Sequence, residues 1–229
     1  MSADEWQALN AEIVACRACP RLVEWRELVA RRKRLAFRDW EYWGRPVPGF
    51  GDPQARLLMV GLAPGAHGSN RTGRMFTGDS SGETLYAALH RAGYANRPSA
   101  VHRDDGLQLR DSFITAAVRC APPGNRPTRQ EIQNCQRFLM RELRLLTGLR
   151  VVVALGRVAF EECQPSLREL GYELPPMAFG HGRHFALAHG APGSIRHVIA
   201  SYHPSRQNTQ TGRLTPAMLD EVFQLARSL

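Results

Sequence analysis

The sequence predicts an α/β protein: a three-layer α/β/α arrangement around a central, mostly parallel four-stranded sheet. Short, continuous apolar runs are typical of strands that are buried on both faces. Four such runs occur, "RLLMVG" (56–61), "SFITAAV" (112–118), "RVVVALG" (150–156) and "RHVIASY" (196–202). Helix-like stretches separate them, and this alternation of buried strands and helices favours a parallel, doubly wound sheet.

The helices are predicted from apolar spacing and from capping residues. Residues 5–34 have apolar positions three and four apart, interrupted by the proline of "CRACP". Three later helices begin with recognisable N-terminal signals: Ser80 with Glu83, Thr128 with Glu131, and Thr215 with Pro216. The segments between the strands are therefore expected to be helical.

The chain is expected to form a single domain, residues 1–229. With 229 residues and 43% apolar content, it can bury a substantial core. All four tryptophans precede position 44, and "GRPVPGFGDP" then interrupts regular structure. We expect residues 1–52 to be an N-terminal extension that packs on the main domain.

The charge balance favours an anionic partner. Lys and Arg total 30 against 21 for Asp and Glu, a net charge of +9, which favours nucleic acid over a small acidic molecule. No apolar run approaches the roughly 20 residues that span a bilayer. We expect a soluble, cytoplasmic, nucleoid-associated protein that makes no membrane contact.

The loops after the four predicted strands carry most of the distinctive residues. They read "GLAPGAHGSNRTGRMFTGD", "RCAPPGNRPT", "GRVAF" and "SYHPSRQNTQTGR", and three of the four are rich in Gly, Pro, Asn and His. Ligands of open α/β sheets bind outside the carboxyl ends of the strands. The sequence therefore predicts one active site built from three loops.

Each polar candidate in these loops also has a structural explanation. Asp79 stands where it can cap a helix, Asn125 lies in a turn sequence, and His203 precedes a proline. The glycines of the first loop allow close backbone approach to a ligand or simply a tight turn, and the loop lacks the ending of a P-loop. The loops alone leave the reaction open.

Five cysteines occur, and four of them form a candidate metal site. Cys16 and Cys19 make a CxxC pair, while Cys120 and Cys135 follow at a wider, irregular spacing. Four thiolates suit tetrahedral zinc or a [4Fe-4S] cluster, and the irregular second pair favours iron and sulfur. Cys163 is expected to be a small buried apolar residue.

Several long motifs together resemble one known family. "GLAPGAHGSNRTGRMFTGD", "AAVRCAPPGNRPT", "VALGR" and "SYHPSRQNTQTGRLT", with these cysteines, resemble the family 5 (type b) uracil-DNA glycosylases, from about Cys16 to the C-terminus. The resemblance implies the uracil-DNA glycosylase-like fold and a [4Fe-4S] cluster on the four cysteines just named. It also implies excision of uracil and of other deaminated bases such as hypoxanthine.

The resemblance also assigns roles within the loops. His203 would donate to an oxygen of the departing base, Asp79 would act on water or on the sugar's positive charge, and Asn125 would hold the water or the base. The predicted substrate-binding residues are Gly61, Ala63, Gly65, His67 and Phe76, with Phe76 as the stacking platform. Ala63 stands where several related families carry an acid or asparagine, so water activation is expected to depend on Asp79.

The DNA contacts are expected in the loop after "HPS". By resemblance this loop enters the minor groove, with amides and arginines at 206–210 and the predicted contacts Ser205, Arg206, Gln207 and Asn208. The expected partners are double- and single-stranded DNA with damaged bases, bound by a monomer. Lys33 is the only lysine and lies far in sequence from these loops, which predicts a monofunctional enzyme without a Schiff base.

Two other functions fit part of the sequence. A non-catalytic iron-sulfur protein that binds nucleic acid explains the charge and the cysteines, but not three polar loops on one sheet edge. A metal-dependent nuclease needs clustered carboxylates, and the loops offer mainly Asp79. Release of free base from uracil-containing DNA distinguishes the three.

Overall fold

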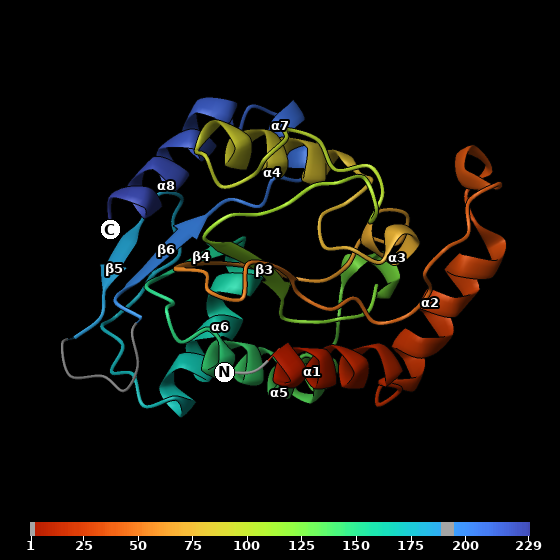
Figure 1. The fold of residues 1–229 in the computed structure, drawn as a ribbon, viewed down its shortest axis with the longest axis horizontal. Helices are drawn as coiled ribbons and strands as arrows, with labels where there is room; N and C mark the ends of the chain where they lie inside the picture. Colours follow the sequence, from red (N-terminus) through yellow and green to blue (C-terminus); the bar gives the residue numbers. More distant parts are fainter. Residues whose placement is uncertain (1–2, 189–194) are drawn as a thin grey trace.

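The protein is built on a six-stranded sheet with helices on both faces (Figure 1). A computed structural model describes residues 3–188 and 195–229. The strand order across the sheet is β1-β3-β2-β4-β6-β5. The strands are β1 (Phe50–Gly51), β2 (Leu57–Gly61), β3 (Ser112–Ala116), β4 (Val151–Leu155), β5 (His184–Ala186) and β6 (His197–Ser201).

The four predicted strands form the parallel centre of this sheet, and each begins within one residue of its apolar run. The pairs β3–β2, β2–β4 and β4–β6 are all parallel. The prediction of four strands missed β1 and β5, which pair antiparallel at the two edges. These edge strands have only two and three residues, none fully buried, so they leave no apolar run in the sequence.

Helices pack on both faces of the sheet. Figure 1 shows α4 and α8 on one face and α1, α5 and α6 on the other. The helices are α1 (Ala3–Ala15), α2 (Pro20–Arg32), α3 (Ser69–Thr72), α4 (Ser80–Arg91), α5 (Arg129–Leu145), α6 (Arg157–Glu169), α7 (Arg206–Gln210) and α8 (Pro216–Ser228), with short 3-10 turns η1 (Leu35–Phe37) and η2 (Pro123–Asn125). None of the helices in the described ranges is both long and apolar enough to cross a membrane.

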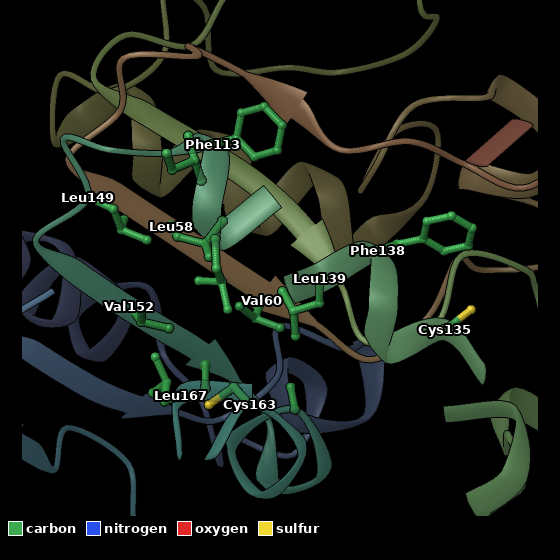
Figure 2. Close-up of a cluster of buried hydrophobic side chains, with 14 of the residues drawn as sticks. Leu58, Val60, Phe113, Cys135, Phe138, Leu139, Leu149, Val152, Cys163 and Leu167 are labelled. Carbon is green, nitrogen blue, oxygen red and sulfur yellow. The ribbon is translucent and has the colours of Figure 1, made fainter. Parts of the chain in front are cut away.

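Strand side chains alternate between two cores. Leu58 and Val60 join the cluster on the α5 and α6 face, where Figure 2 shows them with Leu139. Leu57 and Met59 join the opposite cluster under α4 and α8. This alternation follows from the two-residue period of a strand, and it explains why successive positions of the runs are apolar instead of alternating with polar residues.

The N-terminal helices belong to the first of these cores. The Trp6 ring of α1 lies 5.0 Å, centroid to centroid, from the Phe113 ring of β3. Leu9, Ile13 and Leu22 are fully buried in the same cluster. Residues of the predicted extension therefore pack directly on the sheet.

Two of the three predicted helix caps are present, and the third falls one residue earlier than predicted. Thr128 and Glu131 form the reciprocal capping box of α5, and Thr215 caps α8. At α4 the cap is Asp79 instead of Ser80, because the Asp79 Oδ1 atom accepts the Gly82 backbone N–H at 3.0 Å. The helix start is therefore tied to a predicted site residue.

Candidate active site and cysteine cluster

A pocket of about 470 Å³ opens at the carboxyl ends of the parallel strands. That volume is typical of sites for small organic groups. Its walls come from the loops after β2, β3 and β6: Leu62, Ala63, Gly65, Ser69, Met75, Phe76, Asp79, Ser80, Ser81, Ala116, Asn125, His203, Ser205, Arg206 and Gln207. The three loops that the sequence selected therefore meet in one cavity.

Asp79 lies in the pocket wall beneath the glycine loop. Its Oδ2 atom is so close to Gly68 that a Cβ atom added there would lie 1.9 Å away, and one added at Gly65 would lie 3.0 Å away. Burial raises the pKa of the Asp79 carboxyl, while backbone hydrogen bonds from Gly82 and Ser81 lower it; the net shift is upward. Gly68 is needed because a side chain there would occupy the place of this carboxylate, and a side chain at Gly65 would crowd it.

Phe76 provides the aromatic wall of the pocket. Its backbone is left-handed (φ 51°), an uncommon conformation for a bulky residue that points to a constraint on where the ring lies. Gly61 lies behind the ring, and a Cβ atom added there would be 2.9 Å from it. The Phe76 and His203 rings are 5.8 Å apart, tilted by 32°.

His203 faces Phe76 from the loop after β6. Burial lowers its pKa to about 4, so the imidazole is neutral at neutral pH. Its backbone carbonyl accepts the Asn208 side-chain amide at 2.8 Å, which ties the histidine to α7. A neutral imidazole still carries one N–H group, which can donate a hydrogen bond to a developing anion.

The remaining predicted residues at the pocket mouth come from η2 and α7. Asn125 has a left-handed backbone (φ 57°), so it is both the turn residue that its sequence suggested and part of the pocket wall. Ser205 caps α7 through the Asn208 N–H, and Arg206 and Gln207 are exposed at the rim. Asn208 itself lies outside the wall and supports His203.

His67 and Gly61 are the predicted substrate-binding residues that the structure places outside the pocket wall. The His67 Nδ1 atom is 3.1 Å from the hydroxyl of Tyr42, a residue that does not line the cavity either. Conversely, Ser69, Ser81 and Met75 line the pocket although the sequence analysis did not name them as site residues. Ser69 and Met75 lie inside the quoted first motif, and that position is the signal that could have identified them.

A larger hollow of about 650 Å³ lies elsewhere, between α1, α2 and residues 43–45. It is open to the surface, and its walls contain arginines and alanines but none of the strand-end loops. It therefore lacks the converging polar groups of the pocket at the sheet edge.

The four predicted cysteine ligands line one small, enclosed cavity between α2, the loop after β3 and α5. They are Cys16, Cys19, Cys120 and Cys135. Within residues 3–188 and 195–229, no three His, Cys, Asp or Glu side chains are grouped around a single ion position. Cys163 lies apart, fully buried, and its thiol donates to the Phe160 carbonyl at 3.3 Å.

Each of the four sulfur atoms has an N–H donor. The Cys120 Sγ atom accepts from Arg26 at 2.9 Å, Cys19 from the Asn134 amide at 3.5 Å, and Cys16 from Arg137 at 3.7 Å. The backbone N–H of Arg119 donates to Cys135. Donors of this kind suit sulfur atoms that carry negative charge. The Cys163 thiol, in contrast, is itself the donor of a hydrogen bond.

Arg26 gives a second indication of negative charge at this cavity. The residue is only 2% exposed, its Nε atom has no partner, and it forms no ion pair with any described carboxylate. A buried, uncompensated guanidinium costs several kcal/mol, roughly 3–5 by comparison with broken buried pairs. Burial also raises the pKa of the Cys120 thiol to about 12, so a bound metal centre has to displace that proton. The donor set therefore fits an anionic metal–thiolate group.

Comparisons with known proteins agree with the family resemblance of the sequence motifs. Residues 48–227 match the family model described as "Uracil DNA glycosylase superfamily". The chain is similar to the "Type-5 uracil-DNA glycosylase" of Thermus thermophilus (55% identical, 97% of each chain). It is also similar to the proteins of that name from Mycobacterium leprae (55% identical, 96% of this chain and 94% of the relative) and Pyrobaculum aerophilum (49% identical, 93% and 88%).

Proposed function

Because this chain belongs to the uracil DNA glycosylase superfamily, we propose that it excises uracil from DNA and that the pocket at the sheet edge performs the reaction. The observation that carries the proposal is the convergence of Asp79, Asn125, Phe76 and His203 in one cavity. A duplex buries its bases, so the uracil must leave the stack to reach such a pocket.

The reaction is a hydrolysis at the sugar carbon that carries the base. The carbon–nitrogen bond breaks as a water oxygen bonds to that carbon; the base leaves with the bonding electrons, and the proton from water goes to the base or to solvent. Positive charge develops on the sugar and negative charge on the base. The carboxylate of Asp79 stabilises the sugar or orients the water, and His203 donates its N–H to a base oxygen.

Phe76 and Asn125 bind the base before it is cut. The Phe76 ring offers a stacking surface, and the Asn125 amide can both donate to and accept from a base edge. An amide that can rotate accepts more than one pattern of edge groups. This supports excision of other deaminated bases, such as hypoxanthine, in addition to uracil.

The four cavity cysteines would hold a [4Fe-4S] cluster in a structural role. When bound, such a cluster supplies four metal–sulfur bonds between α2, the loop after β3 and α5. Arg26, Asn134 and Arg137 would donate hydrogen bonds to its sulfur ligands. The pocket residues lie on other loops, so no step of the hydrolysis uses it.

The reaction is hydrolytic because no lysine lines the pocket. Lys33, the only lysine, donates from Nζ to the Arg38 carbonyl at 3.1 Å, in the turn after α2. Arginine stays protonated and cannot form a Schiff base in its place. The product is an intact strand with an abasic site.

The test uses a labelled oligonucleotide with one uracil, as single strand and as duplex, together with the matched thymine substrate. We expect free uracil and an alkali-labile site from the uracil substrates only, and no protein–DNA adduct after borohydride. Failure to release base would refute the glycosylase function and leave the non-catalytic nucleic-acid-binding protein. An adduct lost in Lys33→Ala would refute the hydrolytic route.

A further inference from the structure

The turn after α2 presents an unusual surface. Leu35 is 80% exposed, more than the two other large apolar side chains found exposed in the described residues. Arg31, Arg32, Arg34 and Arg38 surround it in sequence and are also exposed. In Figure 1 this turn, drawn in orange, stands clear of the body beyond α3. We name residues 31–38 the basic turn.

Contacts with the active-site loop hold the basic turn in place. The Arg71 guanidinium lies 3.9 Å from the centroids of both the Phe37 and the Trp40 ring. The same side chain donates to the His67 carbonyl at 2.8 Å and to the Gly78 carbonyl at 2.7 Å. Gly78 directly precedes Asp79, so one arginine connects the basic turn to the loop that carries the pocket carboxylate.

The shape of the turn is also fixed locally. Lys33 ends α2 with a left-handed backbone (φ 53°), and its Nζ atom closes the turn on the Arg38 carbonyl. The Tyr42 hydroxyl accepts the Arg34 backbone N–H at 3.4 Å and contacts His67. An ordered projection loses less conformational entropy on binding than a flexible one.

Three of the four arginines of the basic turn, Arg31, Arg32 and Arg34, form no ion pair with a described residue. Arg38 is paired with Asp39 at 3.6 Å, and the charge of Arg31 contributes to lowering the pKa of Glu27 on α2. Unpaired guanidinium groups around one projecting apolar side chain suit a polyanion with a groove. Duplex DNA offers phosphates for the arginines and a minor-groove wall of sugars and base edges for Leu35.

We propose that the basic turn is a second DNA-contacting element, separate from α7, in which the arginines bind phosphates and Leu35 packs in the minor groove. The proposal rests on the proposed function, because DNA is taken as the substrate of the adjacent pocket. It assigns the N-terminal part of the chain a direct contact with substrate.

The test measures binding to a duplex with a 2′-fluoro-deoxyuridine, which resists cleavage, by fluorescence anisotropy over a range of salt. Arg32→Gln/Arg34→Gln is compared with the wild type. The control, Arg144→Gln/Arg168→Gln, removes two exposed charges from α5 and α6. Melting temperatures confirm that all variants are folded.

We expect the negative slope of log K against log salt to decrease in magnitude by about 2 in the basic-turn variant and to stay unchanged in the control. Leu35→Ala should weaken binding by about tenfold with an unchanged slope. Single-turnover uracil release at saturating DNA should match the wild type in both, because neither change touches the pocket.

Equal slopes for the wild type and Arg32→Gln/Arg34→Gln, with full uracil release, would overturn this proposal and leave the proposed function intact. Binding of the same variants to vesicles of anionic lipid is measured in parallel. If Arg32→Gln/Arg34→Gln loses vesicle binding while its DNA slope equals that of the wild type, the proposal is also overturned. A wild type that releases no uracil would refute the proposed function instead, and the salt slopes would still report on DNA contact.

Discussion

Asp79 combines a structural and a chemical position in one side chain. One carboxylate oxygen caps α4, and the other lies under Gly65 and Gly68 in the pocket wall. The helix therefore fixes where the charge is placed. The sequence offered the cap and the catalytic role as alternatives, and the geometry allows both at once.

Replacing Asp79 with asparagine separates the two roles. Asparagine caps a helix about as well as aspartate, so Asp79→Asn should melt at or above the wild-type temperature. The lost charge should slow single-turnover base release by about 10²- to 10⁴-fold with little change in DNA affinity. Asp79→Ala is the comparison, since it also loses the cap and should cost about 0.5–2 kcal/mol of stability. A fully active Asp79→Asn protein would leave this residue as a cap only.

The pH dependence should report the same carboxylate. Burial moves the pKa of Asp79 above its ordinary value of 3.8, so the rate should fall as pH decreases through that raised pKa. His203 is neutral above its pKa of about 4 and adds a change only at the acidic end. Single-turnover rates from about pH 4 to pH 8 test this. In Asp79→Asn the acidic decline due to this group should disappear; an unchanged decline would assign it to another residue.

Contacts between distant side chains are the part of the site that sequence reasoning could not reach. Arg71 contacts the rings of Phe37 and Trp40, which are more than thirty positions away in the chain. No local spacing encodes such a contact. His67 was expected at the substrate because it stands in the first motif, but its position in that motif does not determine its side-chain direction, which is toward Tyr42.

At the level of elements, the central strands and the helix starts were predictable, and the edges were not. Burial on both faces makes most positions of β2, β3 and β4 apolar, with Ser112 and Thr115 of β3 as buried polar exceptions, and this signal is readable without a structure. The edge strands β1 and β5 depend on pairing with neighbours that are far away in sequence. The start of α4 was misplaced by one residue because Ser80 and Glu83 imitate the spacing of a capping box.

The loop between β2 and α4 should be sensitive to a single methyl group. In Gly68→Ala the new Cβ atom would lie 1.9 Å from the Asp79 Oδ2 atom, so the carboxylate must move. We expect base release to slow by up to the factor predicted for Asp79→Asn, because the charge is displaced but kept. Gly148→Ala, whose Cβ atom would have its nearest neighbour at 3.3 Å, is the control and should keep its rate. Equal rates for both variants would show that the exact place of the carboxylate is unimportant.

Across the whole molecule, the cysteines divide into two chemical groups. Four line one cavity and accept N–H bonds, whereas Cys163 donates to the Phe160 carbonyl within its own helix, α6. Figure 2 shows Cys135 and Cys163 at separate places in the same apolar cluster. Burial alone does not distinguish these groups, but the direction of hydrogen bonding does.

Metal content should follow this division. The wild-type protein should be brown, with about four irons per chain. Cys120→Ser should lose most of the iron and melt at a lower temperature, while Cys163→Ser should keep its iron. Iron analysis and visible absorption of anaerobically purified proteins provide the measurement. Colourless protein with one zinc per chain, or equal iron in both variants, would contradict the assignment.

The distribution of the four cavity cysteines along the chain also sets an order of events during synthesis. Two are in the first twenty residues, and the others follow at positions 120 and 135, so a group held by all four closes a loop of roughly a hundred residues, which costs several RT in chain entropy. The ligand set is complete only after Cys135, in the second turn of α5, has left the ribosome. By then β2, β3 and the loop with Gly65 and Gly68 have emerged, but β4 and β6 have not. Metal loading by all four cysteines thus cannot guide the first helices as they emerge; it can only fasten them afterwards to a partly assembled sheet.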